Sequence, residues 1–249
     1  MKQVPNLITC LNLLAGSFAC VIALKYNNYT AAFLFIVLAA IFDFLDGLAA
    51  RLLKAYSNIG AELDSLADVI SFGLAPACIV YSYFEFYTRF TLGLPLLAFL
   101  LPVFSALRLA KFNIDSRQTT SFLGLPVPAS GLFWASFIPS IPWIAPSFSI
   151  YTQLTIVVVL IIAFCVLMVS ELPMFSLKFK NLKWKDNRWP FVLIGISVVV
   201  MAVFAALGTA LLGVSMIILV YIILSVIKYL FTTSPSQNKK PAQNTPPTS

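Results

Sequence analysis

The sequence predicts an all-α fold, a polytopic bundle of about eight membrane-spanning helices. Of the 249 residues, 60% are hydrophobic and only 10% are charged, whereas a soluble domain carries roughly 25% charged residues. The apolar residues gather in runs of about 20, the length that a helix needs to cross a bilayer. The alternating pattern of a membrane barrel is absent from the sequence, and backbone hydrogen bonding in lipid favours helices for these runs.

Eight apolar segments follow one another along the chain. The first is too long for the apolar part of a signal peptide and contains Asn6 and Asn12, so we interpret it as a retained span. We expect one transmembrane domain over 1–231 and a polar, disordered cytoplasmic tail over 232–249, which is rich in Pro, Ser and Asn. The eight segments are 4–24, 30–52, 59–84, 91–111, 126–146, 151–172, 189–207 and 211–231.

The basic residues predict the orientation of these spans. With the N-terminus inside and the spans alternating, the inner loops and ends hold 14 of the 16 Lys and Arg residues, and only Lys25 and Arg89 fall outside. This asymmetry is typical of the positive-inside rule and predicts that both ends are cytoplasmic. The net charge of +7 therefore reads as a topology signal, and we expect no nucleic-acid partner.

Two residue types restrict the chemistry. The chain has no histidine, which leaves carboxylates, Arg, Lys, Ser and Tyr for catalysis. Its four cysteines all fall inside apolar runs without zinc spacing, so we interpret them as packing residues.

The acidic residues are concentrated where the second and third spans meet. Five of the nine lie between positions 43 and 68. Asp43 and Asp46 are spaced i,i+3 and Asp64 and Asp68 are spaced i,i+4, so each pair shares one helix face. An acid inside a span costs roughly 2.5–3.5 kcal/mol even on a lenient insertion scale, so these carboxylates must face the bundle interior, a cavity or a metal.

Folding the two spans as an antiparallel pair brings the carboxylates together. With the turn near Tyr56, Asp43 lies level with Asp68, and Asp46 lies one residue from the level of Asp64. This arrangement predicts an acidic pocket that opens to the cytoplasm.

Clustered carboxylates cannot all ionise without cations. Oxygen ligands suit hard divalent ions such as Mg²⁺, Mn²⁺ or Ca²⁺, and metals held by carboxylates favour phosphate chemistry. Small residues on the same faces leave room for a ligand, and Arg51 offers a permanent cation for a pyrophosphate. A cation-coupled transporter, whose intramembrane acids bind H⁺ or Na⁺, is the alternative from a different class. The small residues are Gly47, Ala50 and Gly60.

The motif formed by these residues resembles the CDP-alcohol phosphatidyltransferase family at every fixed position. The motif reads Asp43-x2-Asp46-Gly47-x2-Ala50-Arg51-x8-Gly60-x3-Asp64-x3-Asp68. The resemblance implies a six-helix core, a homodimer, two divalent metals, and transfer of a phosphatidyl group from CDP-diacylglycerol to an alcohol with release of CMP.

The resemblance also implies roles for the motif residues. Asp43, Asp46 and Asp64 would be shared metal ligands, and Asp68 would be the general base with a further metal contact. The CDP-diacylglycerol site would comprise Asp46, Gly47, Ala50, Arg51 and Gly60.

Three further stretches resemble the membrane-integral phosphatidylserine synthases, a branch of that family. In the first, Asn6, Thr9 and Asn12 lie on one helix face, where they line the pocket or alternatively join helices by hydrogen bonds. The resemblance makes L-serine the expected acceptor and two extra C-terminal helices part of the fold. It also places the protein in a prokaryotic plasma membrane. The three stretches are 6–16, 71–76, and 108–113 followed by 122–128.

The fourth span ends in residues suited to an acceptor. A serine carboxylate entering a negative site needs a fixed cation, which Arg108 can provide, with Lys111 and Asn113 nearby. Topology signalling is the alternative reading of Arg108 and Lys111. Glycerol 3-phosphate or an inositol phosphate would use the same chemistry with a denser basic cluster.

Overall fold

The structure is a computed structural model that describes residues 3–88, 93–115, 122–144, 146–175 and 187–233. It confirms the all-α prediction. The α-helices are α1 (Val4–Tyr26), α2 (Tyr29–Leu52), α3 (Asn58–Asp68), α4 (Ala75–Thr88), α5 (Leu100–Ile114), α6 (Val127–Ile144), α7 (Ile150–Val169), α8 (Arg188–Ala206) and α9 (Ala210–Thr233). A π-helix η1 (Val69–Leu74), a 3-10 helix η2 (Leu94–Phe99) and two short strands, β1 (Phe122–Leu123) and β2 (Pro173–Met174), complete the described elements.

Each of the eight predicted apolar segments contains helix, and seven helices in the described part of the chain are long and apolar enough to cross a membrane. The exception is α6, which has 18 residues, two internal prolines and three serines. Because α6 is largely enclosed by other helices, it does not need the apolar surface of a lipid-facing span. The segment from Asn58 to Thr88 forms one continuous helical span of 31 residues.

Some predictions concern residues outside the described ranges. The predicted tail begins inside α9, which ends at Thr233, and its remainder over 234–249 is not described. The same holds for several basic residues that support the orientation, namely Lys2, Arg89, Arg117, Lys178, Lys180, Lys183, Lys185, Lys239 and Lys240.

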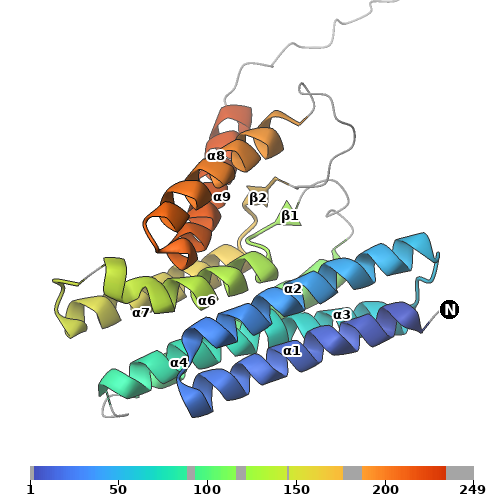
Figure 1. Cartoon of the computed structure of the whole chain (residues 1–249). Helices are drawn as coiled ribbons and strands as arrows, with labels where there is room; N and C mark the ends of the chain where they lie inside the picture. The colour runs from blue at the N-terminus through green and yellow to red at the C-terminus, as the bar shows by residue number, and fades with distance from the viewer. Residues whose placement is uncertain (1–2, 89–92, 116–121, 145, 176–186, 234–249) are drawn as a thin grey trace, which may run out of the picture.

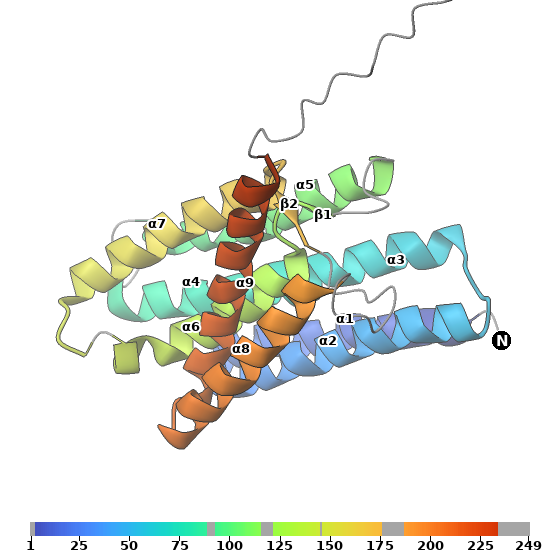
Figure 2. The ribbon, with the colours of Figure 1, turned by 90° about the horizontal axis from the view of Figure 1, so that it is seen from above.

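The first four helices form one side of the molecule. Helices α1 and α2 pack as an antiparallel pair, and the α3–η1–α4 span lies alongside them, so that the beginning of α1 is next to the α2–α3 turn (Figure 1). Helices α8 and α9 form a hairpin that crosses α6, while α5 and α7 lie on the other side of α4 (Figure 2). The acidic residues of α2 and α3 are therefore near the turn end of the first bundle.

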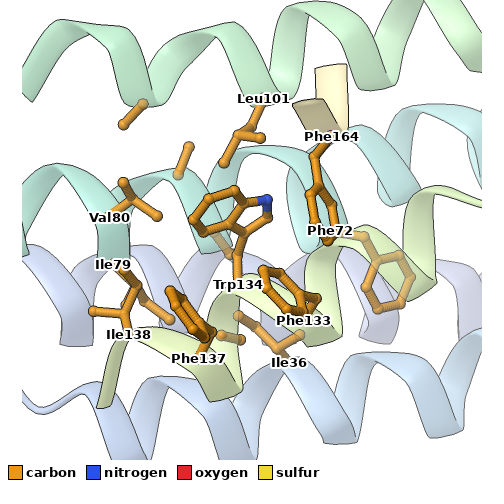
Figure 3. Close-up of a cluster of buried hydrophobic side chains, with 14 of the residues drawn as sticks. Ile36, Phe72, Ile79, Val80, Leu101, Phe133, Trp134, Phe137, Ile138 and Phe164 are labelled. Carbon is orange, nitrogen blue, oxygen red and sulfur yellow. The ribbon is translucent and has the colours of Figure 1, made fainter. Parts of the chain in front are cut away.

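Aromatic side chains fill the centre of the bundle, mostly from α6. Trp134 is fully buried and is surrounded by residues of α2, α4, α5 and α7 (Figure 3). Phe133 stacks on Phe164 of α7 with ring centroids 4.3 Å apart and on Phe137 at 5.0 Å. Such pairs contribute about 0.5–1.5 kcal/mol beyond area burial, and the Phe133–Phe164 pair fixes α6 against α7.

The π-helix η1 follows Asp68 directly and is held on several sides. The hydroxyl of Ser71 donates to the carbonyl of Asn12 on α1 at 3.0 Å. A methyl group at Gly131 of α6 would come within 2.8 Å of Phe72 Cα, so the backbones of α6 and η1 are in direct contact. These contacts set the rotation of the helix that carries Asp68.

A small antiparallel ribbon joins the α5–α6 connection to the segment after α7. Strand β1 pairs with β2, with Phe122 opposite Met174. Gly124 follows β1 with φ of 75°, and its N–H donates to Leu172 O at 2.9 Å. A side chain at Gly124 would be strained in this conformation and would meet Ser170 O at 2.9 Å. The ribbon thereby places Leu125 beside the end of α5.

Candidate active site

Three of the four predicted aspartates form one acidic group. Asp43 of α2 and Asp64 and Asp68 of α3 each offer a carboxylate oxygen within 4.8 Å of the others. The level predicted for Asp43 and Asp68 by antiparallel pairing agrees with this geometry. Asp68 is only 7% exposed, and one oxygen each of Asp64 and Asp68 lacks a hydrogen-bond partner among the described residues. Unpartnered buried carboxylate oxygens this close together fit a hard divalent ion.

Asp46 lies beside this group and is held by α1. It is 6% exposed and accepts a 2.6 Å hydrogen bond from the Thr9 hydroxyl. Thr9 is buried as well, so the contact fixes the carboxylate from the first helix. Asp46 and Asp64 both line the adjoining cavity.

This cavity, which we call the motif cavity, has a volume of about 210 Å³. Nothing but the Arg51 side chain, at 4.0 Å, approaches the Cβ position of Gly47, so the glycine leaves open space. At Gly60 the space is already filled, because a Cβ there would meet Asn6 Oδ1 and Ser57 Oγ at 2.9 Å. The prediction that Gly60 leaves room for a ligand is therefore wrong for its Cβ position, which Asn6 of α1 and Ser57 occupy. The cavity is lined by Pro5, Asn6, Thr9, Asp46, Gly47, Ala50, Ala55, Tyr56, Ser57, Gly60, Ala61 and Asp64.

Arg51 lies outside the lining of the motif cavity. Its side chain is exposed, and its Nε donates to Gly47 O, one turn earlier, at 2.9 Å. The guanidinium group thus projects at the edge of the cavity, next to Gly47.

Arg108 is the most enclosed of the predicted acceptor residues. It is 6% exposed, and its Nε donates to Leu125 O at 2.7 Å. Its guanidinium carbon lies 5.6 Å from the Phe112 ring centroid, and its Nη2 has no hydrogen-bond partner among the described residues. Arg108 also interacts electrostatically with Asp68. A buried guanidinium with a free donor beside the acidic group can receive an anion.

The other predicted acceptor residues are engaged elsewhere. The ammonium nitrogen of Lys111 lies 3.8 Å from a carboxylate oxygen of Glu171, and both side chains are well exposed. Asn113 donates from Nδ2 to Ser65 Oγ at 3.0 Å on the surface. Lys111 and Asn113 therefore differ from Arg108, because they are at the surface and already have partners.

Asn12, unlike Lys111 and Asn113, is buried and its side-chain amide has no hydrogen-bond partner among the described residues. It is fully buried and lies within interaction range of Asp68, yet neither amide atom has a partner of normal hydrogen-bond geometry among the described residues. Because buried amides are nearly always satisfied, this side chain marks a polar position at the site.

The fold and this site define a membrane-embedded protein with an acidic centre next to a small cavity. The family model described as CDP-alcohol phosphatidyltransferase matches residues 2–169, which is most of the chain. The chain belongs to this family. The match includes α1 to α7 and leaves α8 and α9 outside.

Several relatives carry the name CDP-diacylglycerol–serine O-phosphatidyltransferase. The Bacillus subtilis protein is 41% identical over 132 residues, which are 53% of this chain and 73% of that protein. The Helicobacter pylori protein is 41% identical over 130 residues, 51% of this chain and 54% of that protein. The Methanocaldococcus jannaschii protein is 38% identical over 135 residues, 54% and 59% of the two chains. The similarity thus spans little more than half of the latter two relatives.

Sequence reasoning missed two groups near Arg108. One is the carbonyl of Leu125, for which a sequence carries no signal. The other is Tyr221 of α9, which is 6% exposed and interacts electrostatically with Arg108. Its hydroxyl is one of several polar groups in a largely apolar helix, so the sequence did not single it out.

Proposed function

We propose that the protein transfers the phosphatidyl group of CDP-diacylglycerol to the hydroxyl of L-serine, giving phosphatidylserine and CMP. The observation that carries this proposal is the buried Arg108 with a free Nη2 beside the acidic group. The family supports phosphatidyl transfer, and the names of the relatives support serine as the acceptor.

On the nucleotide side, the motif cavity is suited to the CDP group. Gly47 and Ala50 permit close approach, Gly60 and Asp46 complete the wall, and Arg51 at the edge can turn toward a pyrophosphate. Asn6 and Thr9 line the same cavity from α1, and Asn12 lies deeper, beside Asp68.

Divalent cations fit the carboxylates, with Asp43, Asp46, Asp64 and Asp68 as the ligands. Mg²⁺, Mn²⁺ or Ca²⁺, two ions in the family pattern, would supply neutralisation of the pyrophosphate and of the departing phosphate. The acyl chains of the substrate remain in the surrounding lipid.

The protein residues perform the proton transfer and the orientation of the acceptor. Asp68 accepts the proton of the serine hydroxyl through a carboxylate oxygen, and Arg108 holds the serine carboxylate. The serine oxygen forms a bond to the β-phosphorus while the bond from that phosphorus to the oxygen of CMP breaks. CMP leaves with the electron pair of that bond.

The nearest alternatives change only the acceptor. Glycerol 3-phosphate or an inositol phosphate calls for several basic groups. Lys111 is paired with Glu171, and among the described residues Arg108 is the one buried cation. Family membership argues against a cation-coupled transporter, which would show ion flux without CMP release.

The deciding experiment supplies membranes containing the protein with CDP-diacylglycerol, Mn²⁺ or Mg²⁺, and a panel of labelled alcohols. We expect CMP release and a labelled lipid with serine. A labelled product with glycerol 3-phosphate or an inositol phosphate in place of serine would contradict the acceptor, and ion flux without CMP would contradict the reaction.

Asp43→Asn tests the metal assignment. The amide replaces an anionic oxygen within the acidic group, so the Mn²⁺ or Mg²⁺ concentration for half-maximal activity should rise by about tenfold or more, with weaker nucleotide binding. A metal titration of CMP release and of CDP-diacylglycerol binding measures both. Superimposable titration curves for parent and variant would remove Asp43 from the ligands.

We further propose that residues 1–231 form one domain in a prokaryotic plasma membrane, as a homodimer, with the site facing the cytoplasm. The basic residues at the site end of the described helices support this orientation. Arg51 is in the last turn of α2 and Lys54 follows that helix, and Arg108 and Lys111 are near the end of α5. Lys25 is at the opposite end of the bundle, in the last turn of α1.

A cysteine at Ser57 tests this orientation. Ser57 caps α3 at the α2–α3 turn and is partly accessible. In a version lacking Cys10, Cys20, Cys78 and Cys165, Ser57→Cys should react with an impermeant thiol reagent only after the cells are opened. Labelling of intact cells would place the site on the outer face.

A further inference from the structure

Helix α9 lies outside the family match but reaches the residue that we assign to the acceptor. We propose that Tyr221 of α9 is a positioning residue that orients Arg108, so that this protein selects an alcohol bearing a carboxylate. The inference rests on the proposed function, because it concerns the same acceptor residue, Arg108.

Tyr221 is buried and fixed by its own contacts. Its hydroxyl donates to Phe175 O at 3.2 Å, and its ring packs edge-on against the Phe175 ring with centroids 5.1 Å apart. Helix α9 is separately attached to α6 by the buried hydrogen bond between Ser215 and Ser136 at 2.7 Å. The position of Tyr221 is therefore set independently of Arg108.

A short path leads from Tyr221 to Arg108 through the ribbon. Phe175 directly follows β2, and β2 pairs with β1. Beyond β1, Leu125 is anchored by its N–H, which donates to Leu167 O at 3.0 Å, and its carbonyl accepts from Arg108 Nε. In Figure 1 the ribbon lies between α9 and the first helices. Tyr221 thus anchors the β1–β2 ribbon, and the residue after this ribbon, Leu125, accepts the hydrogen bond from Arg108.

The Tyr221 side chain also lies within electrostatic range of Arg108. With its proton donated to Phe175 O, Tyr221 is a neutral phenol, so it does not neutralise the guanidinium. Asp68 also lies within electrostatic range of Arg108, but no group of the described residues forms a hydrogen bond with Nη2, so this donor is available.

These contacts indicate the class of ligand. The Leu125 carbonyl occupies Nε and the Phe112 ring faces the guanidinium group, which leaves Nη2 as a buried donor. A carboxylate oxygen is a strong acceptor for a guanidinium N–H, and such a charge-assisted hydrogen bond is stronger than a neutral one. The free Nη2 therefore suits a small hydroxy acid such as serine, and an alcohol without a carboxylate cannot form this bond.

The test compares Tyr221→Phe with Ser215→Ala in the full-length protein. Tyr221→Phe keeps the ring and removes one oxygen, so the KM for serine should rise about three- to tenfold, as for the loss of one hydrogen bond. Its kcat and its KM for CDP-diacylglycerol should stay at parent values, and its preference for serine over ethanolamine should fall. Ser215→Ala removes the α9–α6 bond and should lower the melting temperature without changing the KM for serine.

A double-mutant comparison separates positioning from general packing. In an Arg108→Lys background, Tyr221→Phe should have no further effect on the KM for serine, because both changes act through the same group. Since KM does not depend on the active fraction, partial unfolding does not obscure this result. If Tyr221→Phe does not fold, Tyr221→Leu, which also lacks the hydroxyl donor, provides the same comparison.

Three outcomes decide between the proposals. An unchanged serine KM in Tyr221→Phe, with a raised one in Arg108→Ala, would overturn the role of Tyr221 and leave the proposed function intact. Equal effects of Tyr221→Phe and Ser215→Ala on the KM for serine would make the role structural and overturn the inference. Parent enzyme that uses ethanolamine as well as serine would overturn the proposed acceptor itself.

Discussion

Asp68→Asn should abolish turnover while CDP-diacylglycerol still binds. Asp68 is 7% exposed, has an unpartnered oxygen and belongs to the three-carboxylate group. Because the chain has no histidine, no imidazole can replace this base. Loss of a general base typically costs about 10²–10⁴-fold in rate. The measurement is single-turnover CMP release with serine, together with nucleotide binding at saturating metal.

Glu62→Gln is the matched control for this variant. Glu62 is an exposed acid on the same helix, and its change also converts a carboxylate to an amide. We expect activity close to that of the parent protein. Activity of Asp68→Asn near that of the control would exclude Asp68 as the base, and loss of nucleotide binding would make it chiefly a ligand.

The helical fold and the acidic group could be predicted because both follow from local spacing. Apolar runs of span length permit helices in lipid and little else. The i,i+3 and i,i+4 spacings fix the face of each aspartate, and the short turn brings α3 back alongside the α1–α2 pair. Asp43 and Asp68, 25 positions apart, were therefore placed at the same level and do lie together.

The features that could not be predicted depend on tertiary contacts. Two-residue strands show no alternation, so β1 and β2 left no pattern. The π-helix after Asp68 depends on its neighbours at Asn12 and Gly131, which belong to other helices. The burial of α6 could not be separated from lipid exposure by composition alone.

Side-chain partners at the site show the same limit. The sequence placed Thr9 and Asp46 on suitable faces of two helices, but their 2.6 Å contact requires the packing of α1 against α2. Arg108 and Lys111 looked equivalent, one turn apart on α5. The structure buries Arg108 and directs Lys111 to Glu171, because the ribbon covers only one of them.

Arg108→Ala should raise the serine concentration required for half-maximal activity by tens-fold or more. The acceptor carboxylate enters a site that already holds four aspartates, and the free Nη2 of Arg108 is the buried donor available to it. Breaking a charge-assisted pair in a partly buried site costs about 2–5 kcal/mol. Affinity for CDP-diacylglycerol should change little, because the motif cavity is lined by α1, α2, the α2–α3 turn and α3.

Activity with acceptors that lack a carboxylate shows whether Arg108 binds the carboxylate of serine. Serine esters and ethanolamine should be poor acceptors for the parent enzyme and should lose little further in Arg108→Ala, so that the variant narrows the difference between serine and ethanolamine. If the variant fails equally toward serine and CDP-diacylglycerol, Arg108 belongs to the nucleotide site or to folding.

Lys111→Ala distinguishes a serine acceptor from a phosphate acceptor. A dianionic phosphate would draw Lys111 away from its exposed pair with Glu171, so the variant would lose activity. If serine is recognised through Arg108, the activity of Lys111→Ala should stay close to that of the parent enzyme.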